Sequence, residues 1–134
     1  MNGELERYKF GQVAGADVFL VLYPDPWASP EDYDALTPKQ VEAWQNDEWF
    51  YVTTEVEIAY EGATVGTASY GGIEYGLFTY TNDDDEIQKR EEITAKDLWE
   101  YVGEELKGEA MSIALENINK LIKWREAVEC LESY

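Results

Sequence analysis

Histidine is absent from this 134-residue sequence, and cysteine occurs once, as Cys130. The absence of histidine removes the commonest general base and the commonest metal ligand of proteins. Cys130 lies near the C-terminal end of a predicted helix, where the dipole disfavours a thiolate, so we expect a packed thiol and not a nucleophile. A single cysteine excludes an intrachain disulfide and is typical of a reducing compartment.

Long apolar runs are also missing. No stretch approaches the ~20 apolar residues that a membrane-spanning helix needs. The N-terminal sequence MNGELERYKF lacks the basic start and the apolar centre of a signal peptide. These absences predict a cytoplasmic protein with no membrane partner.

Basic residues are few. The chain has 10 Lys and Arg against 29 Asp and Glu, which gives a net charge of −19, and residues 1–67 and 68–134 carry −10 and −9 of it. Such a field repels nucleic acids and membranes and attracts the basic proteins that bind them. The alternative is that the acidity serves solubility or life in high salt. Because 45% of the residues are hydrophobic and 14% aromatic, we expect a folded acidic domain spanning residues 1–134 and no disordered acidic tail.

Motifs that carry chemistry are not found either. With 29 acidic residues, pairs of carboxylates arise by chance and do not indicate a glycoside hydrolase. The run Asp83–Glu86 lacks the ligand spacing and the central glycine of a calcium loop, and a solvated loop is the simpler interpretation. No Walker A or dinucleotide-binding pattern occurs. We therefore predict a protein that is not an enzyme and has no metal or cofactor; a buried acid pair of raised pKa would favour a carboxylate-dependent hydrolase instead.

The pattern of apolar residues predicts an α+β fold with a small antiparallel sheet of about three strands. A strand is expected at 17–23, and a hairpin at 49–60 and 64–75 with a turn at Glu61-Gly62. The expected register places Tyr60 opposite Ala63, Ile58 opposite Val65, Val56 opposite Thr67 and Phe50 opposite Ile73. Residues 77–92 are polar and are predicted to form a loop.

Helices are expected at 38–46, after the capping sequence Thr37-Pro38, and at 94–131. In the second region two apolar stripes differ in phase, and the change lies at Lys107-Gly108. We predict a C-terminal helix pair, or one long helix kinked at that point, because a straight helix would expose one stripe.

A row of carboxylates is expected where the acidic loop meets this helical region. Its length and sign are those of a phosphate backbone, although a charge run is also typical of a solvated face. The candidate partner-binding residues are Asp83, Asp84, Asp85, Glu86, Glu91, Glu92, Asp97, Glu100 and Glu104.

The hairpin carries a resemblance to a family. Trp44-x-x-x-Glu48-Trp49, followed by Gly66-x-Ala68-Ser69-x-x-Gly72-Ile73-Glu74, resembles uncharacterised small acidic proteins of actinobacteria and their phages. The likeness covers about residues 41–76, and it departs from the family at Tyr70-Gly71, where Leu-Trp is usual. It implies a phage or mobile-element setting and no particular activity.

The sequence leads to two hypotheses. The first is a non-enzymatic phage protein that inhibits a host defence system, such as a CRISPR effector or a restriction enzyme, by mimicking DNA. Its partner would be a basic surface of a nucleic-acid-binding protein or nuclease complex, with no direct contact to nucleic acid. The alternative is a structural or adaptor module, or a homodimer, that uses an apolar face of the hairpin or of the C-terminal helix.

Overall fold

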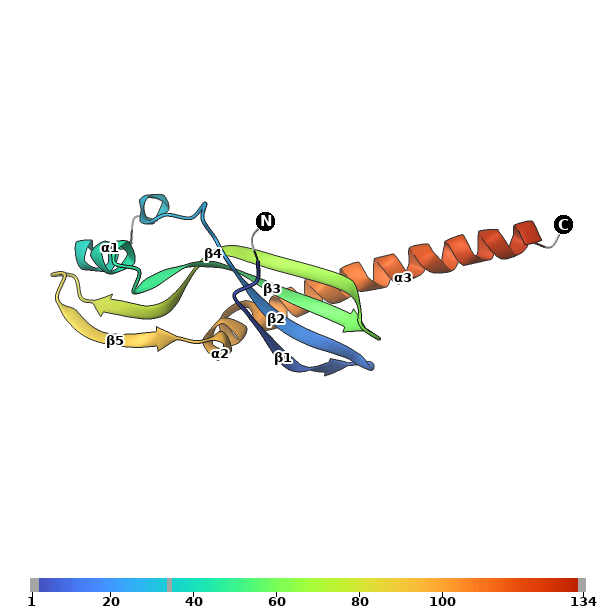
Figure 1. The fold of residues 1–134 in the computed structure, drawn as a ribbon, viewed down its shortest axis with the longest axis horizontal. Coiled ribbons are helices and arrows are strands. Elements are labelled where there is room, and N and C mark those ends of the chain that lie inside the picture. Colours follow the sequence, from blue (N-terminus) through green and yellow to red (C-terminus); the bar gives the residue numbers. More distant parts are fainter. Residues whose placement is uncertain (1–2, 34, 133–134) are drawn as a thin grey trace.

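A computed structural model describes residues 3–33 and 35–132, so the outermost two residues at each end of the predicted domain and residue 34 lie outside it. Its centre is an antiparallel sheet of five strands in the order β1-β2-β3-β4-β5 (Figure 1). The strands are β1 (Glu6–Val13), β2 (Ala16–Pro24), β3 (Trp49–Tyr60), β4 (Ala63–Thr81) and β5 (Ile87–Ile93). The helical elements are η1 (Pro30–Asp32), α1 (Pro38–Gln45), α2 (Ala95–Leu98), η2 (Trp99–Gly103) and α3 (Glu104–Glu132). The prediction of about three strands is therefore wrong.

The two strands beyond the three that were predicted are the edges of the sheet, although the alternation of Tyr8 and Phe10 with charged residues gave a weak sign of β1. β1 pairs with β2 from Glu6 opposite Leu22 to Val13 opposite Ala16, and most of its residues are exposed. β5 is exposed over nearly its whole length, and it pairs with the second half of β4. Edge strands bury little and often carry charge, which hides the apolar alternation by which strands are predicted. The predicted loop at 77–92 is thus the end of β4, a tight turn and β5.

The hairpin begins as predicted and then slips by one residue. Tyr60 lies opposite Ala63, and both turn residues, Glu61 and Gly62, have positive φ. A bulge then shifts the pairing, so Ile58 lies opposite Gly66 and not Val65.

The corrected register continues along the hairpin. Val56 lies opposite Ala68 and Phe50 opposite Tyr75, so the predicted partners Thr67 and Ile73 are wrong. A second irregularity falls at Gly71-Gly72, where Gly72 has a φ of 69°. The slip sets Gly66 against α3, where an added Cβ would lie 2.1 Å from the carbonyl oxygen of Ala110.

Two apolar clusters lie on opposite faces of the sheet, since neighbouring strand residues point to opposite sides. One contains Trp49, Tyr51 and Phe78 beneath α1, and the indole nitrogen of Trp49 donates to the carbonyl of Gln40. The larger one lies under α2, η2 and the first part of α3. Its buried members are Ala16, Val18, Leu20, Leu22, Val52, Val56, Ile58, Ile73, Ala95, Leu98, Val102, Leu106 and Ala110.

The C-terminal region is helical from Ala95 to Glu132, and its change of phase occurs earlier than predicted. The wide π turn η2 holds one residue more per turn than the flanking α-helix, which rotates the apolar stripe. Gly103 makes room for it, because a Cβ there would meet the Trp99 ring at 2.4 Å. Helix α3 then runs unbroken through Lys107 and Gly108, so the predicted kink at that point is wrong.

Gly108 provides a test of this continuity. It lies inside α3 with nothing within 4 Å of an added Cβ. We expect Gly108→Ala to raise the free energy of unfolding by about 1 kcal/mol, since alanine loses less backbone entropy in a helix. Urea denaturation measures this change, and a loss of stability would contradict an unbroken α3.

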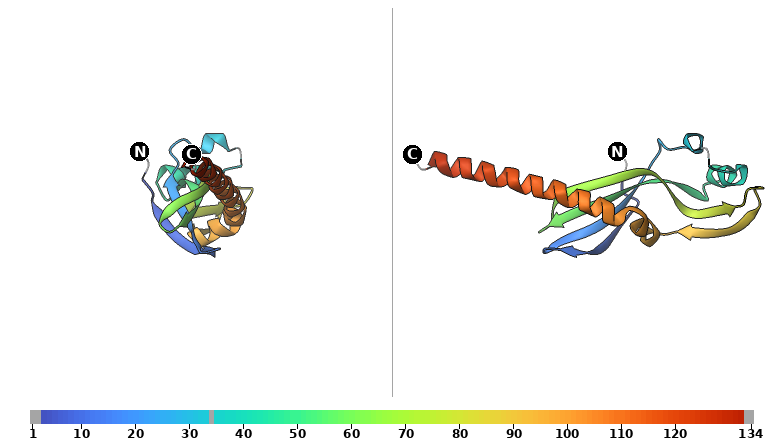
Figure 2. Two further views of the ribbon diagram at one scale, coloured as in Figure 1. Left: turned by 90° about the vertical axis from the view of Figure 1, so that its right-hand side faces the viewer. Right: turned by 180° about the vertical axis from the view of Figure 1, so that it is seen from behind.

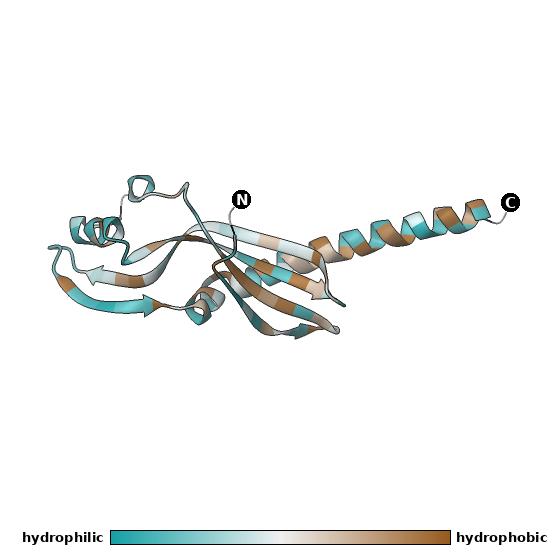
Figure 3. Cartoon of the chain, in the orientation of Figure 1, coloured by the Kyte–Doolittle hydropathy of each residue, from teal (hydrophilic) through white to brown (hydrophobic). Residues whose placement is uncertain are grey.

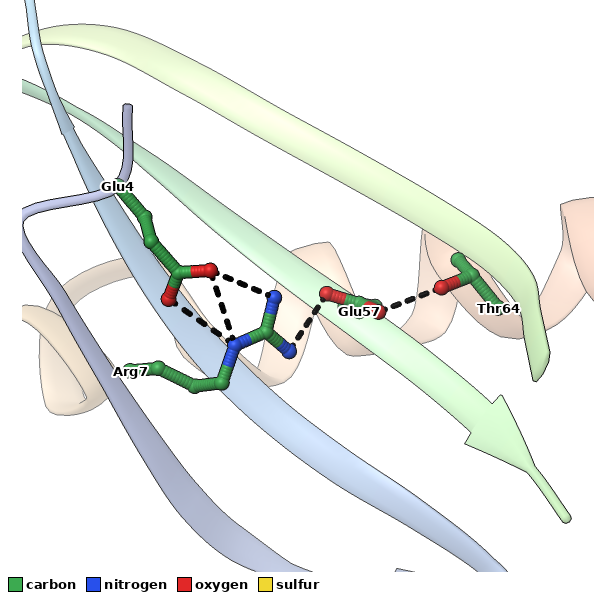
Figure 4. A network of polar contacts seen from close by, with 4 residues as sticks. All are labelled: Glu4, Arg7, Glu57 and Thr64. Carbon is green, nitrogen blue, oxygen red and sulfur yellow. Dashed lines mark hydrogen bonds and ion pairs between the residues drawn. The ribbon is translucent and has the colours of Figure 1, made fainter. Parts of the chain in front are cut away.

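On the face of the sheet away from α3, a polar network joins three strands (Figure 4). Arg7 forms ion pairs with Glu4 at 3.0 Å and with Glu57 at 2.9 Å, and Glu57 accepts a hydrogen bond from Thr64. The Glu57 side chain is only 12% exposed, so the arginine compensates for its partial loss of water. The network holds β1, β3 and β4 in register at this end of the sheet.

Only the first part of α3 packs on the sheet. Leu106, Ala110 and Ala114 are buried, and the side-chain amide of Asn117 donates to the carbonyl of Val65 at 3.0 Å. Beyond this contact the helix projects into solvent, as the view from behind shows (Figure 2, right). With 29 residues, α3 is about 43 Å long.

Candidate binding surface

The nine predicted contact residues fall into two groups at opposite ends of the β4–β5 hairpin. All are exposed except Asp85, which is half-buried. Residues 83–86 form the turn at the tip, whereas Asp97, Glu100 and Glu104 follow the base of β5. Glu91 and Glu92 lie near the end of β5. Seven strand residues span about 23 Å, so the predicted row is divided.

The tip acids lie in the turn between β4 and β5, which is held mainly by Asn82. The side-chain oxygen of Asn82 accepts hydrogen bonds from the backbone nitrogens of Asp84 and Glu86. Asp85 has a positive φ of 59°, and its carboxylate accepts from the backbone nitrogen of Lys39 at 3.3 Å. Asn82 and Asp85 thus account for the shape of this turn.

Asp97 begins the helical region. Its carboxylate accepts hydrogen bonds from the backbone nitrogen and the hydroxyl of Thr94, at 2.8 and 3.0 Å. The backbone bond first, and then the hydroxyl, lower the pKa of Asp97. Its negative charge is therefore fixed at the start of α2.

A hollow of about 400 Å³ lies between β4, β5 and α2–η2. It brings together Glu91, Glu92 and Asp97 from the predicted set and adds Glu74 from β4. Its remaining lining residues are Ile73, Tyr80, Ile93, Leu98 and Tyr101. Four acidic residues thus line one hollow, and none of its lining residues is basic. Glu91 and Glu92 are neighbours in β5, so their side chains leave the strand on opposite faces.

A second hollow of about 330 Å³ adjoins the first and shares Ile73, Glu74 and Tyr101 with it. Its other lining residues are Tyr33, Tyr70, Gly71 and Gly72. Tyr101 is 70% exposed and Tyr70 is 55% exposed. We call the two hollows together the acid–tyrosine surface, defined by Glu74, Glu91, Glu92, Asp97, Tyr33, Tyr70, Tyr80 and Tyr101.

The glycine pair positions the tyrosine side of this surface. The backbone nitrogen of Gly72 donates to Asp25 at 2.8 Å, and its carbonyl accepts from the hydroxyl of Tyr33 at 3.2 Å. A Cβ on Gly72 would lie 2.1 Å from that hydroxyl. Gly71, where the resembling family has tryptophan, keeps a side chain off Asp25 and off the hollow.

Carboxylates beside tyrosine rings form a surface suited to organic cations. A carboxylate pairs with a guanidinium through two oxygens, and a tyrosine face attracts a cation. The chain contains one example: Lys89 lies 4.9 Å from the centre of the Tyr80 ring and 2.8 Å from Glu91.

Sequence reasoning found part of this surface. It named Glu91, Glu92 and Asp97, and it considered the hairpin face around Tyr70 only as an alternative interface. It missed Glu74, Tyr33, Tyr80 and Tyr101, which come from three separate segments of the chain. Glu100 and Glu104 line neither hollow, and Glu104 pairs with Lys107 at 3.5 Å. The high tyrosine content was the only available signal.

A third hollow, of about 610 Å³, contains Glu6. Hydrogen bonds from the hydroxyls of Tyr75 and Tyr8 lower the pKa of this carboxylate. Because these hydrogen bonds favour the ionised carboxylate, they stabilise the folded state at pH values above the unfolded-state pKa of about 4.3. That contribution is lost as the pH falls through the lowered folded-state pKa.

The lowered pKa of Glu6 predicts how the free energy of unfolding depends on pH. We expect wild type to exceed Glu6→Gln in unfolding free energy by a constant amount between about pH 6 and pH 8, and the difference to shrink below about pH 4.5. Urea denaturation of both proteins across this range measures it. A difference that grows on acidification would contradict the assignment.

Cys130 is exposed, so the expectation of a packed thiol is wrong. Within the described residues no group of acidic or cysteine side chains is arranged to hold a metal ion. In the same part of the chain no helix combines the length and hydropathy that a membrane crossing requires. No protein-family model, no curated protein and no solved structure matches the chain.

Proposed function

We propose that this protein is a non-enzymatic binding protein whose acid–tyrosine surface occupies a basic, nucleic-acid-binding surface of another protein. One observation carries the proposal: four acidic residues and four tyrosines line two adjoining hollows of a chain with net charge −19. Arginine and lysine side chains that normally contact phosphates have the matching charge and shape.

The long-range field of the chain supports the same function. A strongly negative protein approaches basic surfaces quickly and is repelled by DNA itself. Solubility alone needs a net charge of only about 2 to 8 in a small domain. The charge in excess of this need then serves binding. The carboxylates compete with the phosphates of nucleic acids for the same basic side chains.

The direction in which carboxylate pKa values are shifted also supports a binding role. Among the described residues, the acids whose pKa departs from its ordinary value are Glu6, Asp17 and Asp97, and in each case hydrogen bonds lower the pKa. A general acid at neutral pH needs the opposite shift, produced by burial or a like charge. This supports a function without acid–base catalysis.

The family resemblance supplies the setting of the proposal. In a phage or mobile element, the basic surface would belong to a host defence complex such as a CRISPR effector or a restriction enzyme. Such complexes hold nucleic acid in positively charged channels. Occupying one of these channels blocks the nucleic acid without any chemistry.

A labelled octa-arginine peptide tests the recognition chemistry directly. Fluorescence anisotropy should show binding at about 50 mM salt and at least tenfold weaker binding at about 300 mM, because screening shortens the reach of exposed charges. Tyr101→Ala should weaken the complex by about threefold through loss of the cation–π contact. No binding at low salt, or binding insensitive to salt, would overturn the proposal.

A second candidate function rests on α3. Its projecting half exposes Leu121, Trp124 and Leu131, which favours an adaptor module that binds through an apolar helix face. Binding through that face would be insensitive to salt, unlike binding through the acid–tyrosine surface.

A further inference from the structure

The third hollow lies where the start of β1 meets the end of β5 and the beginning of α2. Its volume of about 610 Å³ falls within the range of small-molecule sites, about 300 to 1,000 Å³. Ile93, one of its lining residues, ends β5, a strand that is hydrophilic along its middle and hydrophobic at both ends (Figure 3). The hollow shares Glu92 and Ile93 with the first hollow, and its other lining residues are different. It is therefore a separate feature of the molecule.

Four aromatic side chains from three strands line this hollow. They are Tyr8 and Phe10 of β1, Phe50 of β3 and Tyr75 of β4. The Phe50 and Tyr75 rings meet at 79° with their centroids 5.9 Å apart, so they form two walls of a corner. Phe10 is held in place by stacking on Trp99 at 4.8 Å. Tyr8 and Phe50 are 39% and 37% exposed, so the rings are not closed off within the core.

Glu6 places a carboxylate among these rings. The hydroxyls of Tyr75 and Tyr8 donate to the same oxygen, Oε2, at 2.5 and 2.6 Å. Within residues 3–33 and 35–132, the other oxygen, Oε1, has no hydrogen-bond partner. The two tyrosines thus favour the ionised carboxylate, hold it in position and leave one oxygen for a ligand.

Aromatic walls with one carboxylate suit a cation that donates no hydrogen bonds. A quaternary ammonium is attracted both by aromatic rings and by a negative charge, and it has no N–H group that needs an acceptor. A primary ammonium is strongly hydrated and donates three hydrogen bonds, for which aromatic walls offer no acceptors. Among the described residues, no group of acidic side chains is arranged to hold a metal ion. The hollow therefore favours an organic cation over an inorganic one.

We propose that this hollow binds a methylated ammonium group, such as that of choline. The ammonium lies against the corner formed by Phe50 and Tyr75, with Glu6 as its counter-ion. The described lining residues include two acids and one base, so a single cation balances their charge. The proposal does not depend on binding through the acid–tyrosine surface.

Lys96 is the base among these lining residues, and its side chain is exposed. A lysine ammonium near the hollow competes with the ligand for the carboxylates. We therefore expect Lys96→Gln to strengthen choline binding about threefold. Weaker binding by this variant would show that Lys96 contacts an anionic ligand and would overturn the proposal.

Calorimetric titration with choline tests the site in the wild-type protein. We expect one choline per chain with a Kd of about 1 mM or tighter. Dimethylbutanol, the neutral carbon analogue of choline, has nearly the same shape and should bind at least tenfold more weakly because it lacks the charge. No choline binding at about 20 mM, or equal binding of the two compounds, overturns the proposal.

Two variants test the named side chains. Phe50→Leu keeps an apolar group but removes a ring, and Glu6→Gln keeps the shape but removes the charge. Each should weaken choline binding at least fivefold while circular dichroism stays unchanged. The control Tyr70→Leu removes a ring that is 55% exposed and lies outside this hollow, and it should bind choline as wild type does. Wild-type affinity in both Phe50→Leu and Glu6→Gln overturns the proposal. If either variant fails to fold, the comparison of choline with dimethylbutanol decides.

Vesicles of phosphatidylcholine distinguish a lipid head group from a free ligand. We expect the protein to bind free choline and not to sediment with the vesicles, because a chain of net charge −19 repels the phosphate beside the ammonium. Sedimentation that choline prevents would support the same site with a lipid head group as its ligand.

Discussion

Reversing three carboxylates, in Glu74→Lys/Glu91→Lys/Glu92→Lys, is expected to weaken binding of the octa-arginine peptide about 100-fold. Each reversal removes an attraction and adds a repulsion, at about 1 kcal/mol for an exposed pair, and 2.7 kcal/mol corresponds to 100-fold. Asp97 is left unchanged in this variant because it caps α2 through Thr94. Anisotropy at low salt measures the loss.

A matched variant separates the surface from the overall charge. Glu61→Lys/Glu109→Lys/Glu116→Lys changes the net charge by the same amount at three exposed residues outside the acid–tyrosine surface. It should weaken the complex less than about threefold, as expected for long-range screening alone. Equal losses in the two variants would show that only total charge matters and that the surface has no special role.

Gly66→Val is expected to lower the free energy of unfolding by about 3 kcal/mol or more. An added Cβ at this position would lie 2.1 Å from the carbonyl oxygen of Ala110 and 2.9 Å from the backbone nitrogen of Ala114. Both atoms belong to the backbone of α3, so the helix must move away from β4 and uncover the apolar cluster beneath it. Urea denaturation, with circular dichroism as the signal, measures the change.

Gly108→Val is the control for this prediction. It adds the same side chain to a glycine of α3 that has nothing within 4 Å, and the unfolding free energy should change by less than about 0.5 kcal/mol. If Gly66→Val is as mild as the control, α3 does not pack on β4 as the structure has it.

Two of the three strands that the sequence predicted are strands whose residues are buried in the sheet, whereas the third, the first part of β4, was predicted from its turn with β3. β2 and β3 show this, with Leu20, Leu22, Val52 and Val56 all fully buried. The edge strands carry a weaker signal, limited in β1 to the alternation at Tyr8 and Phe10, because polar residues are accepted where a strand faces solvent. The register was missed for another reason: the bulge before Gly66 is fixed by the approach of α3, a contact distant in sequence.

In the C-terminal helical region, too, the local sequence pattern predicted a feature but not its position. Its phase change was visible in the apolar residues, but it was assigned to Gly108 and not to the π turn ending at Gly103. A glycine with open space around it and a glycine under a tryptophan ring look alike in a sequence. The acid–tyrosine surface was only half visible because Glu74 and Tyr101 meet through the fold.

The most direct test of the proposed function uses DNA and a defence nuclease together. A labelled duplex bound to a CRISPR effector or restriction enzyme of an actinobacterial host is titrated with this protein in a gel-shift assay. We predict that wild type releases the DNA at about 50 mM salt and much less at about 300 mM, and that Glu74→Lys/Glu91→Lys/Glu92→Lys releases none. DNA that stays bound throughout a panel of such nucleases, or that is released equally well by the charge-reversed variant, would contradict the proposal.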